Sequence, residues 1–245
     1  MSRPFQPEAP GFFPQTRWSQ VQAAAGQPNA DAQAALEYLC QAYWQPLFVF
    51  ARRSGLASHD AQDLTQDFFR CLLEKRWLET ADPAKGRLRT FLISLFKRFL
   101  GKEWRRAAAQ RRGGGQPLVP LDTELLEKQP DVGGGELPPD LAFDRQWALL
   151  LLHRTMDRLR EDYARAGQAS DFAVLKDCLL ADRGSLDYPV IAAGLGQTEG
   201  AARVAAHRLR KRFRVIYREE IAATVSDPSE VEGELHYLAE ILAKD

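Results

Sequence analysis

The chain has 245 residues, of which 45% are hydrophobic and 27% charged, and its formal net charge is +0 at pH 7. This composition is typical of a globular protein, so it excludes a fibrous or globally disordered chain. Because the net charge is balanced, a nucleic-acid-binding surface is expected only where positive charge is locally concentrated.

The first half of the chain predicts three helices behind an irregular, proline-rich N-terminal extension over residues 1–30. Apolar residues recur at helical spacing from Asp31 to Arg53, which predicts one amphipathic helix or a helix pair, with Pro46 as a kink or break. Ser58 is suited to cap a second helix. A third helix is predicted from Leu88 towards Arg112, and its C-terminal half is strongly basic.

Residues 113–144 are predicted to form a linker between two helical domains. Two Gly-Gly-Gly tracts and several prolines lie in this segment, and a packed helix does not tolerate such a composition. Its charges are mostly acidic, which inverts the sign of the segment before it. The predicted domains are therefore residues 31–112 and residues 145–222, and the fold class is all-α.

The second half predicts a further set of helices. Helical periodicity marks Trp147 to Leu159 and Phe172 to Leu180, and a short helix from Tyr188 to Leu195 ends at Gly196. A long basic helix begins at Thr198, and a C-terminal tail over residues 223–245 is predicted to contain one more amphipathic helix.

The short helix, the turn at Gly196 and the basic helix together predict a helix-turn-helix, whose second helix enters the major groove of DNA. Residues early in that helix lie nearest to base edges, and those further along are placed for phosphates. The candidate DNA-binding residues are Thr198, Glu199, Ala201, Arg203, His207, Arg208, Arg210 and Lys211. Arg212 is a further candidate for a phosphate contact. The alternative interpretation is a solvated basic face.

A second basic segment lies in the third predicted helix, where aromatic residues alternate with cations. Basic grooves lined by aromatic rings suit single-stranded or unstacked bases. The candidate residues are Arg98, Lys102, Trp104, Arg105 and Arg106. The helical periodicity assigns Phe96 and Phe99 to the core, whereas it leaves the role of Trp104 open.

Three segments in this order resemble sigma-70 family factors of the extracytoplasmic-function class. They are Asp60-Ala61-Gln62-Asp63-Leu64-Thr65-Gln66-Asp67-Phe68-Phe69, Leu88-Arg89-Thr90-Phe91-Leu92, and Tyr188 to Gly200. The resemblance covers residues 31–112 and 145–221, which are similar to regions two and four of that family. At Arg98 and at Ala201-Ala202 the chain departs from residues that many members carry.

The resemblance implies a factor that directs core RNA polymerase to promoters and is not an enzyme in itself. The acidic helix face of Asp60, Asp63, Gln66 and Asp67 would dock on the clamp coiled coil of the polymerase large subunit, although a solvated acidic face is the alternative. The basic segment around Trp104 would bind the minus-ten promoter element, and the helix-turn-helix would bind the minus-thirty-five element. An anti-sigma factor is an open further partner.

Other function classes have little support in the sequence. Cys40, Cys71 and Cys178 form no CxxC pair, so neither a disulfide framework, a metal site nor a cofactor is predicted. The chain has none of the common nucleotide-binding, metalloprotease or hydrolase motifs. Short apolar runs and the lack of a signal segment predict no membrane partner and a cytoplasmic location. A helix-turn-helix regulator that acts without polymerase is the main alternative, and an anti-sigma scaffold is a weaker one.

Overall fold

The computed structural model describes residues 30–82, 86–112, 137–181, 185–225 and 227–244. Within these ranges the chain is helical and contains no strand, which confirms the predicted all-α class. The helices are α2 (Ala30–Arg53), α3 (Ser58–Glu74), η1 (Trp77–Thr80), α4 (Leu88–Arg112), α6 (Pro139–Arg165), α7 (Ala169–Leu175), η3 (Lys176–Leu179), α8 (Tyr188–Leu195), α9 (Glu199–Ala222), η4 (Pro228–Glu230) and α10 (Val231–Ala243). None of the described helices is long and apolar enough to cross a membrane.

The larger hydrophobic cluster combines α2, α3 and α4 with the N-terminal half of α6 and with α10. Phe68 of α3 meets Phe96 of α4 edge to face, with ring centroids 5.0 Å apart. Trp147 of α6 stacks on Tyr43 of α2 at 4.6 Å. Buried side chains from before and after the predicted linker therefore share one core.

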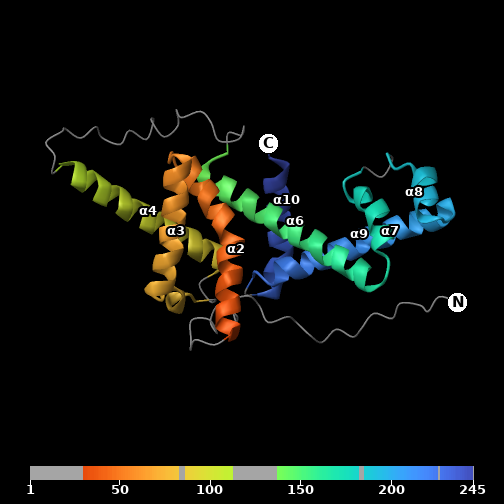
Figure 1. Ribbon diagram of the computed structural model, residues 1–245, viewed down its shortest axis with the longest axis horizontal. Coiled ribbons are helices and arrows are strands. Elements are labelled where there is room, and N and C mark those ends of the chain that lie inside the picture. The colour runs from red at the N-terminus through yellow and green to blue at the C-terminus, as the bar shows by residue number, and fades with distance from the viewer. Residues whose placement is uncertain (1–29, 83–85, 113–136, 182–184, 226, 245) are drawn as a thin grey trace.

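The smaller cluster lies at the other end of the molecule and holds α7, α8 and the N-terminal part of α9 against the C-terminal end of α6 (Figure 1). Its fully buried side chains include Leu159, Leu175 and Leu209. Alanines at positions 202 and 206 of α9 are buried as well, so α8 and α9 approach each other closely.

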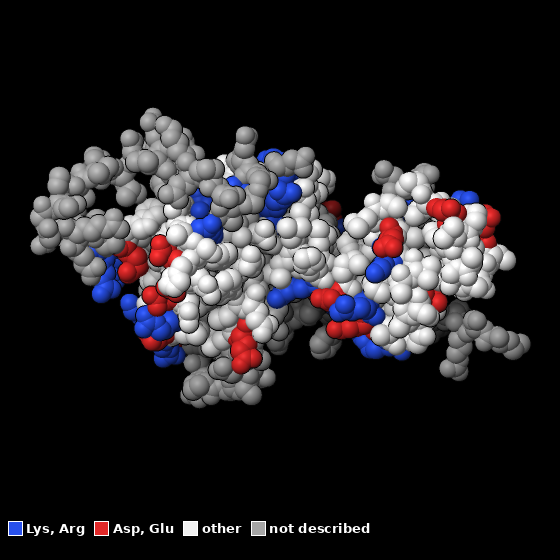
Figure 2. All heavy atoms as spheres, turned by 45° about the horizontal axis from the view of Figure 1, so that its top comes forward, with Lys and Arg blue, Asp and Glu red and all other residues white. Residues whose placement is uncertain are grey.

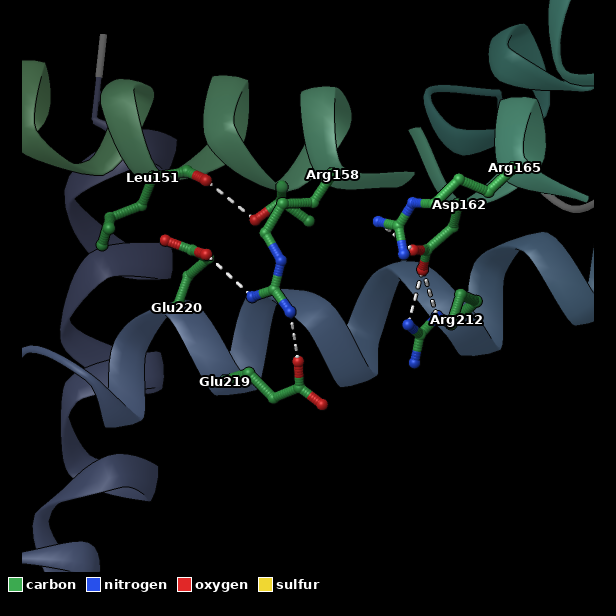
Figure 3. A network of polar contacts seen from close by, with 8 residues as sticks. Leu151, Arg158, Asp162, Arg165, Arg212, Glu219 and Glu220 are labelled. Carbon is green, nitrogen blue, oxygen red and sulfur yellow. Dashed lines mark hydrogen bonds and ion pairs between the residues drawn. The ribbon is translucent and has the colours of Figure 1, made fainter. Parts of the chain in front are cut away.

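Two long helices, α6 and α9, contribute to both clusters. At a rise of about 1.5 Å per residue, each is roughly 35–40 Å long. Ion pairs join them between the clusters, where Arg158 contacts both Glu219 and Glu220 and Arg212 contacts Asp162 (Figure 3). The junction between the two clusters is thus held by charged groups as well as by the helices themselves.

Buried charge also fastens α10 and α6 to the start of α4. Arg89 is 7% exposed and pairs with Glu234 of α10, which is fully buried, and with Asp144 of α6 at 3.2 Å. Arg87 reaches the same Glu234 at 2.5 Å. Burial lowers the pKa of the Arg89 guanidinium from its ordinary value. Tyr237 of α10 donates a hydrogen bond to Asp144, so the predicted tail helix is an integral part of the fold.

Several element boundaries differ from the sequence expectation. The helix α6 begins at Pro139, inside the predicted linker, because proline is favourable in the first turn of a helix. The helix α2 continues through Pro46, since the apolar side chains around it, including Tyr43 and Leu47, are buried. Ser58 is the first residue of α3 and not its cap; the cap position is Ala57, which has no side-chain hydrogen bond.

Other predicted elements hold as expected or lie outside the description. The bounds of α4 and α8 match the predicted helices, and Thr198 caps α9. The predicted helix from Phe172 to Leu180 is instead divided into α7 and a short 3₁₀ turn. The predicted N-terminal extension, apart from Ala30, and residues 113–136 of the predicted linker are outside the described residues.

Candidate nucleic-acid interface

Local capping signals build the turn between α8 and α9. Asp187 caps α8 by accepting a hydrogen bond from the backbone nitrogen of Val190 at 3.2 Å. Gly196 ends α8 in the left-handed conformation, with φ of 62°. Thr198 then caps α9 by accepting from the backbone nitrogen of Ala201 at 3.3 Å. The two helices therefore meet at the short turn that a helix-turn-helix requires.

Close packing fixes α8 against α7. A Cβ atom added at Gly194 would lie 3.0 Å from Cγ1 of Val174, so a larger residue there would require the Val174 side chain to shift by a few tenths of an ångström. On the other side of α8, Ile191 and Ala192 are buried in the smaller cluster. With α8 held in this way, α9 buries Ala202 and Ala206 and turns its opposite face to solvent.

The outward face of α9 carries predicted DNA-binding residues at helical spacing. Arg203, His207, Arg208 and Lys211 are exposed there, and none of them has an ion pair or a hydrogen bond within the described residues. Thr198 and Glu199 are exposed at the start of the helix, whereas Ala201 is half-buried. This set is open to a partner.

Val204 lies on the same face and was missed by the sequence analysis. It is 49% exposed. Its position three, four and seven residues before His207, Arg208 and Lys211 places it on their side of the helix. That spacing was visible in the sequence, so helical periodicity was the signal that would have found it.

Arg210 and Arg212, by contrast, are engaged inside the fold. Arg210 donates to the backbone carbonyl of Cys178 at 2.9 Å and to that of Ala181 at 2.7 Å, which satisfies the end of η3. Arg212 donates through Nε to Asp162 at 2.8 Å (Figure 3). The phosphate contacts predicted for these two arginines therefore compete with contacts that hold the helices together.

Arg203 makes a different kind of contact. Its guanidinium carbon lies 4.0 Å from the centroid of the Tyr188 ring, the first residue of α8. Such a cation–π contact joins the two helices of the motif. The sequence contained no signal for this pair, because the residues lie in different helices whose relative placement depends on packing.

The second candidate surface is the C-terminal half of α4. Arg98, Lys102, Arg105 and Arg106 are exposed there. Arg98 and Arg105 donate to carbonyl groups of their own helix at 3.3 and 3.1 Å, contacts that a ligand can replace. Trp104 is half-buried against the larger cluster, so one part of its ring system stays accessible.

The prediction that Phe96 and Phe99 belong to the core is confirmed, since they are 0% and 8% exposed. Both rings pack on Phe68 of α3. Aromatic residues in this segment are therefore divided between core packing and the accessible surface, and only Trp104 is available to a ligand there.

The third candidate surface is the acidic face of α3. Asp60, Asp63, Gln66 and Asp67 are all exposed, while Ala61, Phe68 and Leu72 on the opposite side are buried. Asp63 pairs with His59 at 3.1 Å and Asp67 with Arg70 at 2.9 Å, both within the same helix. Exposed pairs of this kind contribute little stability and leave the carboxylates open to a basic partner.

The three surfaces do not converge on one site. The acidic face of α3 and the basic half of α4 belong to the larger cluster, and the face of α9 lies at the opposite end of the molecule (Figure 1). On the side drawn in Figure 2, acidic and basic side chains are intermixed and no single-sign patch covers the molecule. No group of three or more histidine, cysteine or acidic side chains among the described residues is arranged to hold a metal ion.

In comparisons with known proteins, no family model, no curated protein and no solved structure matches this chain.

Proposed function

We propose that this protein is a sigma factor of the extracytoplasmic-function class, which binds core RNA polymerase and directs it to promoters. The observation that carries the proposal is the capped helix-turn-helix of α8 and α9, whose second helix presents Arg203, His207, Arg208 and Lys211 to solvent without an ion pair within the described residues. A row of exposed basic residues without acidic partners, on a helix suited to the major groove, favours duplex DNA as its ligand.

In this proposal α9 reads the upstream, minus-thirty-five element. Arginine donates to guanine in the major groove, and lysine attracts phosphates as a point charge. Arg203, near the start of the helix, is assigned to base edges, whereas Arg208 and Lys211 are assigned to the backbone. Arg210 and Arg212 are assigned to the fold, since their donors are already used within it.

The basic half of α4 is assigned to the minus-ten element. Unpaired bases stack on aromatic side chains and are neutralised by nearby cations. Trp104 supplies an accessible ring, and Arg98, Lys102, Arg105 and Arg106 supply exposed charge around it. These groups suit the binding of bases as the strands separate. Nucleotide addition belongs to the polymerase, and the protein itself is not an enzyme.

The acidic face of α3 is assigned to the polymerase clamp. Exposed carboxylates along one helix face complement a basic coiled coil and increase its association rate. The proposal further includes a region-two-like domain, a region-four-like domain and a cytoplasmic location. An anti-sigma factor is compatible with the proposal as an additional partner but is not required by it.

In vitro transcription with bacterial core polymerase on a pooled promoter library tests the proposal. The wild type should produce specific start sites. Asp63→Arg/Asp67→Arg should abolish them through loss of polymerase binding, and Arg203→Ala/Lys211→Ala should abolish them through loss of promoter binding. A pull-down with core polymerase separates the two causes, because only the first variant should fail to be retained.

A matched control removes the trivial effect of net charge. Glu161→Arg/Glu240→Arg makes the same charge change at exposed positions of α6 and α10, away from the three surfaces, and should transcribe like the wild type. Specific duplex binding without any stimulation of core polymerase would favour the stand-alone helix-turn-helix regulator, for which α8 and α9 suffice. No duplex binding and no transcription would reject both functions.

A further inference from the structure

Tyr188 and Arg203 form a contact that links the two helices of the helix-turn-helix. The Tyr188 side chain is half-buried and packs on the smaller hydrophobic cluster, so its ring is anchored. Arg203 is exposed, and its guanidinium carbon lies 4.0 Å from the centroid of that ring. A flexible side chain on the outer face of α9 is therefore held by a fixed aromatic surface.

The contact with Tyr188 does not use the hydrogen-bonding groups of Arg203. A guanidinium attracts an aromatic ring through its charge and its flat face, while its five N–H groups lie in its own plane. Arg203 has no ion pair or hydrogen bond within the described residues. Arg210 and Arg212 on the same helix differ in this respect, because their N–H groups are donated to carbonyl and carboxylate oxygens. Arg203 is thus oriented without losing its donors.

An oriented arginine near the start of a recognition helix is suited to read a guanine. Guanine offers O6 and N7 as paired acceptors in the major groove, and arginine matches them with two parallel donors. Binding normally immobilises a long side chain at a cost in entropy. The contact with Tyr188 removes part of that cost before DNA arrives, because the position of the guanidinium over the ring is already restricted.

We propose that Tyr188 is a positioning residue for Arg203 and thereby sets the preference for guanine at one base pair of the duplex element. This positioning role rests on the proposed DNA-binding function. Tyr188 touches no base in this arrangement. It acts through the orientation of the arginine, and its aromatic face is the part that matters, not its hydroxyl group.

The test uses the duplex that the full-length wild-type protein selects from a randomised pool. Each guanine of that duplex is replaced in turn by 7-deazaguanine, which lacks the N7 acceptor, and affinities are measured by fluorescence anisotropy. Wild-type protein should lose affinity at one position that Arg203→Ala no longer distinguishes. Tyr188→Leu should lose about two- to fivefold of the discrimination at that same position, the range expected for an exposed cation–π contact. Tyr188→Phe should retain it.

Arg203→Lys provides a second variant that carries no risk to the fold, because position 203 is exposed. Lysine keeps the charge but has neither the flat face nor the paired donors, so it should bind all duplexes with little discrimination at this position. Thermal unfolding of Tyr188→Leu checks that the variant is folded. If it is not, the comparison of Arg203→Lys with Tyr188→Phe decides the outcome.

Equal weakening of every duplex by Tyr188→Leu, or unchanged discrimination, would overturn the positioning role while leaving the proposed function intact. The same holds if folded Tyr188→Phe discriminates as poorly as Arg203→Lys. If the wild type selects no duplex at all, the proposed function fails, and the positioning role fails with it. The two failures are therefore distinguishable in one set of titrations.

Discussion

The basic helices α4 and α9 use their cations in opposite order along the chain. In α4, the cations nearer the N-terminus are paired: Arg89 with Glu234 and Asp144, and Lys97 with Asp140 at 2.5 Å. Further along, Lys102 and Arg105 are exposed and have no ion pair within the described residues. The paired cations of α4 face α6 and α10, whereas Lys102 and Arg105 are available to a partner.

In α9 the paired cations lie towards the C-terminal half instead, with the exposed and unpaired Arg214 between them. Arg203 and Lys211, nearer the N-terminus, have no ion pairs within the described residues. Further along, Arg212 pairs with Asp162 and Arg218 with Glu232. A run of basic residues in this protein is therefore not one functional unit. Which of its charges are available to a partner depends on which part of the helix is covered by acidic neighbours.

Removal of Arg89 should have the largest effect on stability. In Arg89→Met the fully buried Glu234 carboxylate retains only Arg87, and the free energy of unfolding should fall by about 3–5 kcal/mol. Chemical denaturation measures this loss. Arg70→Met, which breaks an exposed pair, should cost no more than about 1 kcal/mol. Similar losses in both variants would mean that the covered part of α4 has no special role.

Removal of Arg212 should have an intermediate effect. Arg212→Ala breaks the pair with the partly buried Asp162 between the two hydrophobic clusters, and about 1–2 kcal/mol of stability should be lost. Arg214→Ala is the matched control on the same helix, because Arg214 is exposed and has no ion pair within the described residues. It should change the free energy of unfolding by less than about 0.5 kcal/mol. Equal losses of stability in the two variants would contradict the distinction between paired and unpaired cations of α9.

Alkaline pH should lower the free energy of unfolding, because it removes the proton that Tyr237 of α10 donates to Asp144 of α6. Burial, together with the hydrogen bond donated to Asp144, raises the pKa of Tyr237 to about 12, while an unfolded tyrosine titrates near pH 10. The contribution of the protonated Tyr237 hydroxyl to the free energy of unfolding is complete below about pH 10. It is lost as the pH rises towards about 12, because the unfolded state releases the proton first.

Denaturant titrations from about pH 9 to about pH 11 measure this effect as the difference between wild type and Tyr237→Phe. The variant should lose stability less steeply with rising pH, since phenylalanine has no proton to release. Other buried tyrosines titrate in both proteins and cancel in the difference. Parallel curves would show that Tyr237 does not contribute.

Removal of Lys211 should have the smallest effect on stability and a clear effect on DNA binding. Lys211→Ala should change the free energy of unfolding by less than about 0.5 kcal/mol. The slope of log affinity against log salt for duplex DNA should become shallower by about 0.9, the value for one lost phosphate contact. Arg212→Ala should leave this slope unchanged. A shallower slope for Arg212→Ala would place that arginine on the DNA despite its pair with Asp162.

Signals within a few residues predicted α8, the turn at Gly196 and the start of α9 well. Gly196 supplies the left-handed turn and Thr198 the cap, so both helix ends followed from local chemistry. The start of α6 was missed because Pro139 lies in a proline-rich stretch and is equally compatible with a break or with a first helical turn. Local chemistry did not distinguish these two outcomes.

The sequence did not predict in the same way which candidate site residues are exposed and which are engaged inside the fold. The exposed faces of α3 and α9 followed from helical periodicity. The engagement of Arg210 by Cys178 and Ala181 did not, because these residues are about thirty positions apart in sequence and meet only when α7, η3 and α9 pack together. The contact between the Tyr188 ring and Arg203 was not predictable for the same reason, because the two residues belong to different helices.

Local patterns predict the all-helical class, most helix positions and the charged faces, because caps and periodicity act over one or two helical turns. Which charges remain free depends on how the helices pack against one another. Arg89 and Glu234 are 145 residues apart, and a buried carboxylate finds its partner only through the packing of whole helices. Long-range contact, which leaves no local pattern, therefore separated the cations that build the fold from those that can bind a partner.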